Sequence, residues 1–127
     1  MYRSLAHLQD ESNRAWQAVF YKRFQLGQPE TLHLRLIGFP GVIQLQHENP
    51  IELESGNKIL AASDVTPTEF PLAHVGEYDI QPVLAQLDVE KSLKVSLPIE
   101  GGKATIAIPN ETLLEWWRVA SWQPQTP

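Results

Sequence analysis

Alternation of apolar and polar residues, interrupted by glycine and proline turns, is the feature that most constrains the fold of this chain. It is clearest in SLKVSLPIEGGKATIAIP, where every second residue is apolar on both sides of a pair of glycines. This pattern predicts a β-hairpin whose two-residue turn is Gly101-Gly102. One face of the hairpin would carry its apolar residues, which are Leu93, Val95, Leu97, Ile99, Ala104, Ile106 and Ile108.

Similar patterns predict strands throughout the first half of the chain. Residues 2–8 and 15–24 flank the polar stretch DESNR, which is typical of a hairpin loop. Residues 15–24 are apolar on both faces, so we expect a central strand there. Residues 31–37 alternate between apolar and polar side chains, as in a strand with one solvent-exposed face. Further strand-like segments are found at 43–46, 51–54 and 59–60.

The segment GFPG interrupts this alternation at residues 38–41. Pro40 and Gly41 suit the two central positions of a type II turn, because proline sets φ and glycine accepts a positive φ. Phosphate-binding loops lead into a helix, whereas strand-like sequence follows GFPG. We therefore interpret it as a hairpin corner rather than a ligand loop. Phe39, at the tip of this turn, either packs into the core or is exposed and available to bind a partner.

Two short helices complete the expected elements. Asp79 is a candidate N-cap for a helix over residues 80–87, and Asn110 for one over residues 111–121. Residues 62–79 show no period and predict a long irregular loop, which in compact domains is more often functional or mobile. Asn110 also begins a glycosylation sequon, NET, but the capping role accounts for it without a sugar.

The fold class that follows is mainly β, with about seven or eight antiparallel strands and two short helices, one of them C-terminal. A rolled sheet, a small barrel and a sandwich all remain open. We expect one β-rich domain over residues 1–123 and a C-terminal tail over 124–127.

Composition excludes several function classes. The net charge of -5 argues against binding to a nucleic-acid backbone. No apolar run is long enough for a transmembrane helix, which needs about 18 residues. The chain has 0 cysteines, which rules out disulfides, thiolate nucleophiles and cysteine-ligated metals.

Catalytic signatures are also missing, since the chain has no nucleophile elbow, phosphate loop or zinc-protease helix. His74, Glu77 and Asp79 could converge on a cation, but their spacing matches no metal site type, and we expect no metal and no cofactor. Glu52 and Glu54 would lie about 7 Å apart on one strand face, as two-carboxylate hydrolysis requires. Any strand with a wet face gives that pattern, so we do not expect an enzyme.

Aromatic residues supply the remaining candidate sites. In EWWRVASW the simplest expectation is a helix packed over the sheet, and the alternative is an exposed patch that binds a partner. The candidate partner-binding residues are Phe39, Phe70, His74, Trp116, Trp117 and Trp122. If the sheet instead enclosed a ligand, Trp16 and Phe20, together with Phe39, would line the cavity.

Four stretches, SNRAWQAVFYKR, LHLRLIGFPGVIQLQH, VGEYDIQPVLAQL and LPIEGGKATIAIPNETLLEWW, resemble a family of small cyanobacterial proteins known as domain of unknown function number 3122. The resemblance implies a cyanobacterial source and a longer precursor with an export leader. It therefore implies the thylakoid lumen or the periplasm, with the cytoplasm as the alternative. Met1 would then be an added start rather than the natural one. The family brings no catalytic residues.

Three functions remain as hypotheses. The first is a non-enzymatic binding or accessory protein of an exported compartment, with attachment to a membrane complex as one form of it and with a protein partner that the sequence does not identify. The second is a carrier of a small apolar ligand inside a β-barrel. The third is a hydrolase that uses carboxylates of Glu52, Glu54 or the Glu77/Asp79 segment. The oligomeric state stays open.

Overall fold

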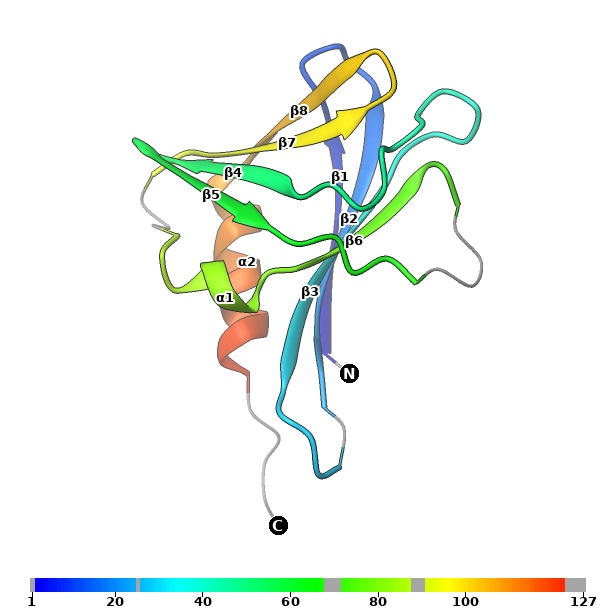
Figure 1. Ribbon diagram of the computed structural model, residues 1–127. Coiled ribbons are helices and arrows are strands. Elements are labelled where there is room, and N and C mark those ends of the chain that lie inside the picture. The colour runs from blue at the N-terminus through cyan, green and yellow to red at the C-terminus, as the bar shows by residue number, and fades with distance from the viewer. Residues whose placement is uncertain (1, 25, 68–71, 88–90, 123–127) are drawn as a thin grey trace.

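The structure is a computed structural model that describes residues 2–24, 26–67, 72–87 and 91–122. Within these residues the chain forms two antiparallel four-stranded sheets and two helices (Figure 1). The expected fold class, mainly β with a C-terminal helix, is confirmed. Of the three architectures left open, the sandwich describes the fold, because the two sheets face each other without closing into a barrel.

Sheet A has the strand order β1-β2-β3-β6. Its inward residues alternate along each strand, as the sequence pattern predicts, and Ala18, Phe20, Leu34 and Leu36 have no exposed surface. The central position expected for residues 15–24 is confirmed, since β2 lies between β1 and β3. The strands are β1 Tyr2–Gln9, β2 Ala15–Arg23, β3 Thr31–Ile37 and β6 Val75–Asp79.

Sheet B has the strand order β5-β4-β7-β8, and its strands run across those of sheet A (Figure 1). Its inner face carries the apolar residues that the hairpin pattern selected, and Val95, Leu97 and Ile106 are fully buried. The hairpin turn lies at Glu100-Gly101, not at Gly101-Gly102, because Gly102 pairs with Ile99. The strands are β4 Ile51–Ser55, β5 Lys58–Ala62, β7 Leu93–Ile99 and β8 Gly102–Ile108.

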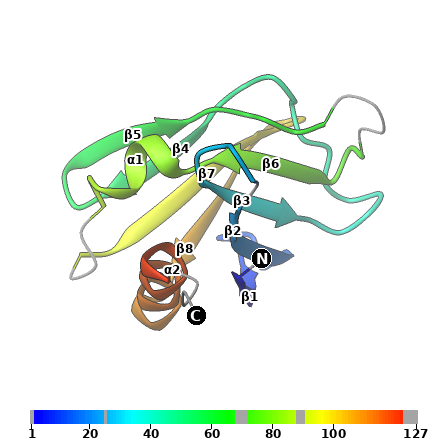
Figure 2. The same ribbon diagram turned by 90° about the horizontal axis from the view of Figure 1, so that it is seen from below.

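Helix α2, Asn110–Ser121, covers the part of sheet A that sheet B leaves open. Figure 2 looks along this helix and shows it on one side of the sheet A strands. Trp116 stacks on Phe20 of β2, with ring centroids 5.3 Å apart and an angle of 9° between the rings. The buried Lys22 donates from Nζ to the carbonyl oxygens of Ala120 and Trp122, at 2.8 and 2.9 Å. Sheet and helix are thus joined by both an aromatic stack and a helix C-cap.

A buried aspartate holds the β1–β2 hairpin that joins the sheets at one end. Asp10 Oδ1 accepts hydrogen bonds from the backbone N–H groups of Ser12 and Arg14, and its Oδ2 accepts from Arg14 Nε and from Trp16 Nε1. Burial raises the pKa of Asp10, but these hydrogen bonds outweigh it and hold the pKa below its usual value. Asp10 also bridges to Ile106 of β8. The DESNR segment is therefore the hairpin loop that its sequence predicts.

Three sequence expectations about the middle of the chain were wrong. Residues 43–46 form no strand, and only Leu45 bridges to Ile99. The supposed loop at 62–79 contains the strand β6. GFPG is therefore not a hairpin corner, because β3 pairs with β6 and not with the segment that follows the turn. Strand β6 forms because the free edge of β3 offers hydrogen-bond partners to its backbone. The irregular sequence pattern of β6 does not reveal this pairing.

The expected helix boundaries also differ. Helix α1 covers only Gln81–Leu84 and begins after Ile80, while Asp79 ends β6 and accepts from the Gln81 N–H at 3.1 Å. Helix α2 begins at Asn110 itself after Pro109, and no side chain caps it. None of the helices in the described ranges is both long and apolar enough to cross a membrane.

Candidate functional site

The candidate site lies on the outer face of sheet A, opposite the core. Strand register fixes which residues are neighbours there. One row across the sheet is formed by His7, Gln17, Ile37 and Val75, and the next by Leu5, Val19, Arg35 and Glu77. The third row is formed by Arg3, Tyr21, His33 and Asp79. Apolar and charged side chains therefore meet on one surface.

Phe39 stands at the end of β3, where the chain leaves the sheet. Val42 N–H donates to the Phe39 carbonyl oxygen at 3.1 Å and Gly41 has a φ of 81°, as a type II turn requires. The Gly38 N–H donates to the His74 carbonyl oxygen at 2.8 Å, which ties the turn to the segment that precedes β6. The Phe39 side chain is nevertheless 61% exposed. The turn thus presents an aromatic ring from a backbone that is well anchored.

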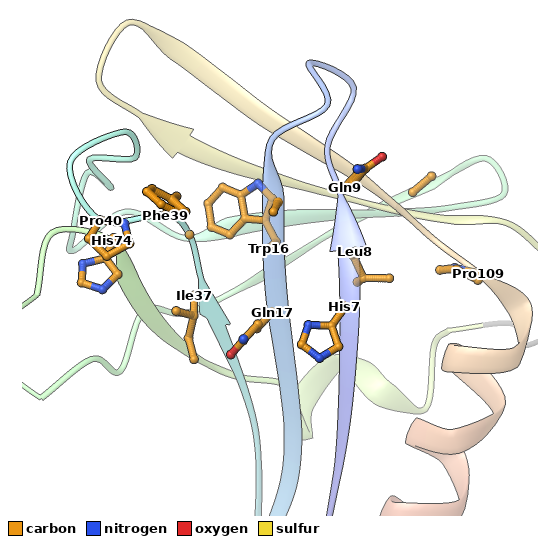
Figure 3. Close-up of a pocket in the computed structure, with 13 residues that line it drawn as sticks. His7, Leu8, Gln9, Trp16, Gln17, Ile37, Phe39, Pro40, His74 and Pro109 are labelled. Atoms are coloured by element: carbon orange, nitrogen blue, oxygen red, sulfur yellow. The ribbon is translucent and has the colours of Figure 1, made fainter.

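Beside Phe39 lies an open groove of about 700 Å³, which we name the Phe39 groove (Figure 3). Its floor is the row of His7, Gln17 and Ile37, and Trp16 contributes to its wall near Phe39. Among the described residues that line it, none is acidic and none is Lys or Arg. The full lining is His7, Leu8, Gln9, Ala15, Trp16, Gln17, Ile37, Gly38, Phe39, Pro40, His74, Ala107 and Pro109.

Next to the groove, four polar side chains form a connected cluster on β2, β3 and β6. Tyr21 Oη donates a short hydrogen bond to Glu77 Oε1, and His33 Nδ1 lies 3.0 Å from the same hydroxyl. Because the phenol proton goes to Glu77, His33 is the donor in the second bond. Arg35 donates to Glu77 Oε1 from Nε at 3.2 Å and from Nη2 at 2.9 Å. Glu77 is therefore the common acceptor of the cluster.

The cluster holds well-defined charges at neutral pH. Burial raises the pKa of Glu77, but the hydrogen bonds from Tyr21 and Arg35 outweigh burial, and the pKa is lowered overall. Burial, together with the hydrogen bond to Glu77, raises the pKa of Tyr21 to about 12. The cluster therefore combines an ionised carboxylate, a neutral phenol and a guanidinium.

A second concavity of about 320 Å³, which we name the Arg35 pocket, opens over this cluster. Arg35 and Glu77 are at its polar end, and Thr66 lies beside them. Thr66 Oγ1 accepts from the Glu77 N–H at 3.0 Å and donates to Asp64. The described residues that line the pocket are Arg35, Ile37, Thr66, Pro67, Leu72, Val75 and Glu77. Ile37 lines both the pocket and the Phe39 groove, so the two concavities adjoin.

The structure brings together three of the residues that the sequence singled out. Phe39, His74 and Trp16 all line the Phe39 groove. Phe70 lies outside the described residues. Phe20, proposed as a ligand-lining residue, is instead fully buried against Trp116, and no space between them is left for a ligand.

The tryptophans of the C-terminal helix do not join this surface. Trp116 is 0% exposed, so we remove it from the candidate partner-binding residues. Trp117 is half-buried, and Trp122, at the end of α2, packs edge-on against Phe24. Trp117 and Trp122 are absent from the lining of the Phe39 groove. Of the three tryptophans, Trp122 is therefore the exposed one, and Trp116 belongs to the core.

The carboxylates considered for hydrolysis are divided between the sheets. Glu52 and Glu54 are exposed on sheet B, opposite Ser96 and Lys94 of β7. Glu77 and Asp79 belong to β6 of sheet A. In the part of the chain that the structure describes, no three His, Asp or Glu side chains are placed to share a metal ion.

Sequence reasoning missed Tyr21, His33 and Arg35 as site residues. His33 and Arg35 alternate with three leucines, a pattern that indicates only a wet strand face. Their partner Glu77 was placed in a loop. The cluster exists only because β2, β3 and β6 pair in this register, and no short motif records that pairing.

Comparison with known proteins gives a family but no activity. The family described as "Protein of unknown function (DUF3122)" matches residues 1–119. The chain belongs to this family. No curated protein and no solved structure matches it. The DUF3122 match covers every strand, the Phe39 groove and the Arg35 pocket, so the surface described above lies within the family's domain.

Proposed function

We propose that this DUF3122 protein is a non-enzymatic binding or accessory protein, and that it docks a segment of a partner protein in the Phe39 groove. The observation that carries the proposal is the exposed Phe39 ring, held at the rim of the groove by an anchored turn. Aromatic side chains in such positions are frequent binding hot spots, because their burial removes a large apolar area from water at little cost in conformational entropy.

The surroundings of Phe39 support a docking surface rather than a chance exposure. Val42, in the same turn, and Leu72, on the segment tied to it, are also exposed. Leu45 N–H donates to the Ala73 carbonyl oxygen at 2.7 Å and keeps these two segments together. Single exposed apolar residues are normal, but several on neighbouring segments are typical of interaction sites, although Val42 and Leu72 themselves lie outside the lining of the groove.

The groove also indicates the chemistry of the partner. The chain contains 15 acidic residues, yet none is among the described residues that line the groove. His7, His74, Gln9 and Gln17 offer ring and amide N–H donors instead. We therefore propose an apolar partner segment with neutral or acidic flanks, since basic flanks would find no acceptor carboxylate in the groove.

The test compares Phe39→Ser with a matched control, Ile59→Ser. Ile59 is an exposed apolar residue on β5 of the other sheet. A photo-crosslinking residue at position 17 in the native cells should capture one protein, whose affinity for the purified chain is then measured. Phe39→Ser should weaken that affinity at least about 30-fold, the effect of losing a hot spot of about 2 kcal/mol, and Ile59→Ser should leave it unchanged.

Equal binding by both variants would reject the groove as the docking site. Failure of the chain with the crosslinking residue at position 17, and no other change, to capture any protein would reject the binding function itself.

We also propose that the protein acts in an exported compartment of a cyanobacterium, the thylakoid lumen or the periplasm, attached to a membrane complex. The support is the similarity of four sequence stretches to small exported cyanobacterial proteins. Cell fractionation with an antibody against the chain tests this. Recovery in the cytoplasmic fraction would contradict it.

A further inference from the structure

We propose that the Arg35 pocket binds a carboxylate that carries an apolar group. This site is separate from the Phe39 groove in its chemistry, and the proposal does not rest on partner docking. Three features support it: Arg35 donors that do not pair with Glu77, the guanidinium groups of Arg23 and Arg35 near Tyr21, and an apolar wall opposite them.

The guanidinium of Arg35 has more N–H donors than its pairing with Glu77 uses. Arg35 uses Nε and one Nη2 hydrogen on a single oxygen of Glu77. A guanidinium has five N–H groups, so this pairing leaves the Nη1 group and one Nη2 hydrogen outside it. The Arg35 side chain is 43% exposed and lines the pocket. A fork of N–H groups at the polar end of a pocket matches the two oxygens of a carboxylate.

The local charge also favours an anion. The guanidinium carbons of Arg23 and Arg35 lie 5.6 and 5.5 Å from the centre of the Tyr21 ring. Only one carboxylate, that of Glu77, hydrogen-bonds to Tyr21 and Arg35 among the described residues. The pocket itself holds one guanidinium, that of Arg35, and one carboxylate, that of Glu77, and Arg23 adds a second positive charge beside Tyr21 without lining the pocket.

Two nearby aspartates also carry negative charge, and each accepts hydrogen bonds from groups other than Arg35. Asp64 accepts from the N–H groups of Glu48 and Thr66, each at 2.8 Å, and lies 3.5 Å from His47 Nδ1. Asp79 accepts from the Gln81 N–H. Neither aspartate is among the residues that line the pocket.

The rest of the pocket is apolar. Ile37 and Val75 form its floor on β3 and β6, and Pro67 and Leu72 form its side. Leu72 is 54% exposed, so a ligand would bury apolar surface there as well as its own. A volume of about 320 Å³ limits the ligand to a small organic acid or to the end of a peptide chain.

The experiment is a titration of the ¹⁵N-labelled protein with hexanoate, followed by amide chemical shifts. Hexanol and hexylamine are the controls, because they keep the chain and replace the carboxylate with a neutral and a cationic group. Hexanoate should shift the amides of Arg35, Leu72, Val75 and Glu77, with a dissociation constant on the order of 1 mM. The two controls should bind at least about tenfold more weakly.

Two variants separate binding from folding. Arg35→Met should weaken hexanoate binding at least about tenfold, since it removes the charged donors. If this variant unfolds, Leu72→Ser tests the proposal instead, because Leu72 is outside the core and its replacement should leave the fold intact. Leu72→Ser should weaken the binding of hexanoate and leave the binding of acetate unchanged. Ile59→Ser, on the other sheet, should change neither affinity.

The source of the carboxylate is resolved by a second probe, the peptide acetyl-Gly-Gly-Leu with a free C-terminus. Tighter binding of this peptide than of hexanoate assigns the pocket to a chain terminus, and weaker binding assigns it to a free acid. Equal affinity for hexanoate and hexanol would overturn the proposal. So would shifts confined to a different concavity, which Arg3 and Arg118 line.

Discussion

Arg35 and Glu77 lie directly opposite each other on β3 and β6, and Arg35 Nη2 is 2.9 Å from Glu77 Oε1. This cross-strand pair attaches β6, whose sequence pattern is weak, to a strand whose pattern is strong. It also places the charged end of the Arg35 pocket beside the Phe39 groove. One strand pairing therefore serves both the stability of sheet A and the composition of its outer face.

Glu77→Gln should destabilise the protein in a pH-dependent way. The folded-state pKa of Glu77 is lowered, so its carboxylate stabilises the fold above the ordinary glutamate pKa of about 4.3, and this contribution is lost as the pH falls below that value. We expect a loss of about 2 kcal/mol at pH 7 that shrinks towards pH 3. Urea unfolding at both pH values measures it.

Glu54→Gln is the matched control for this prediction. Glu54 is exposed on β4, and the substitution should change the free energy of unfolding by less than about 0.5 kcal/mol. A loss for Glu77→Gln that is the same at pH 7 and pH 3 would contradict the role of its charge.

Gly76→Ala should be more damaging than its small size suggests. A Cβ at Gly76 would lie 2.8 Å from Cζ of Tyr78, whose ring is fully buried. We expect a cost of about 3 kcal/mol from overpacking. Gly27→Ala meets no atom within 4 Å and should cost only about 1 kcal/mol, through strain at its φ of 78°. Thermal unfolding compares the two, and equal costs would mean that Tyr78 moves aside freely.

Lys22→Met should loosen the end of helix α2 before it affects the rest of the fold. The Nζ group of Lys22 caps the carbonyl oxygens of Ala120 and Trp122 and lies 3.0 Å from Glu30 Oε2. We expect a loss of about 2 kcal/mol and faster hydrogen exchange in the last turn of α2. The exposed Lys58→Met should change neither quantity. Unchanged exchange in Lys22→Met would show that the cap contributes nothing.

Asp10→Asn should destabilise the hairpin that bridges the sheets. Each carboxylate oxygen of Asp10 accepts two hydrogen bonds, whereas an amide offers one oxygen, so two donors lose their acceptor. One oxygen serves the buried indole of Trp16, and we expect a cost of about 3 kcal/mol with a change in near-ultraviolet circular dichroism. Glu11→Gln, next to it and exposed, is the control. A spectrum that matches the unaltered protein would argue against this network.

Alternation predicted most of the strands because each of those strands has one face in water and one in the core. Leu32, Leu34 and Leu36 point inward as the pattern requires. The pattern failed for β6, since its inward residues are Gly76 and Tyr78 rather than a run of aliphatic side chains. It also failed after GFPG, where apolar residues at 43 and 45 pack into the core without belonging to a strand.

The aromatic residues show the same division. Adjacent positions on a helix point about 100° apart, so the sequence indicated that Trp116 and Trp117 differ in burial. The expected apolar stripe, which contained Leu113, Leu114, Trp117 and Ala120, was wrong about which one packs on the sheet, because Trp116 is buried and Leu114 is exposed. The docking of α2 against Phe20 made Trp116 the buried one. Phe39 was equally undecided between core and surface until the turn was placed at the end of β3.

The sequence by itself determined the mainly β class, the inward face of the regular strands, the type II turn at Pro40-Gly41 and the helix at the C-terminus. These depend on local periodicity and on the φ preferences of single residues. Only the tertiary structure decided that β6 completes sheet A, that Tyr21, His33, Arg35 and Glu77 meet, and that Phe39 faces a groove. Those contacts join residues up to 56 positions apart, as Tyr21 and Glu77 show, and strand pairing at that range leaves no local pattern in the sequence.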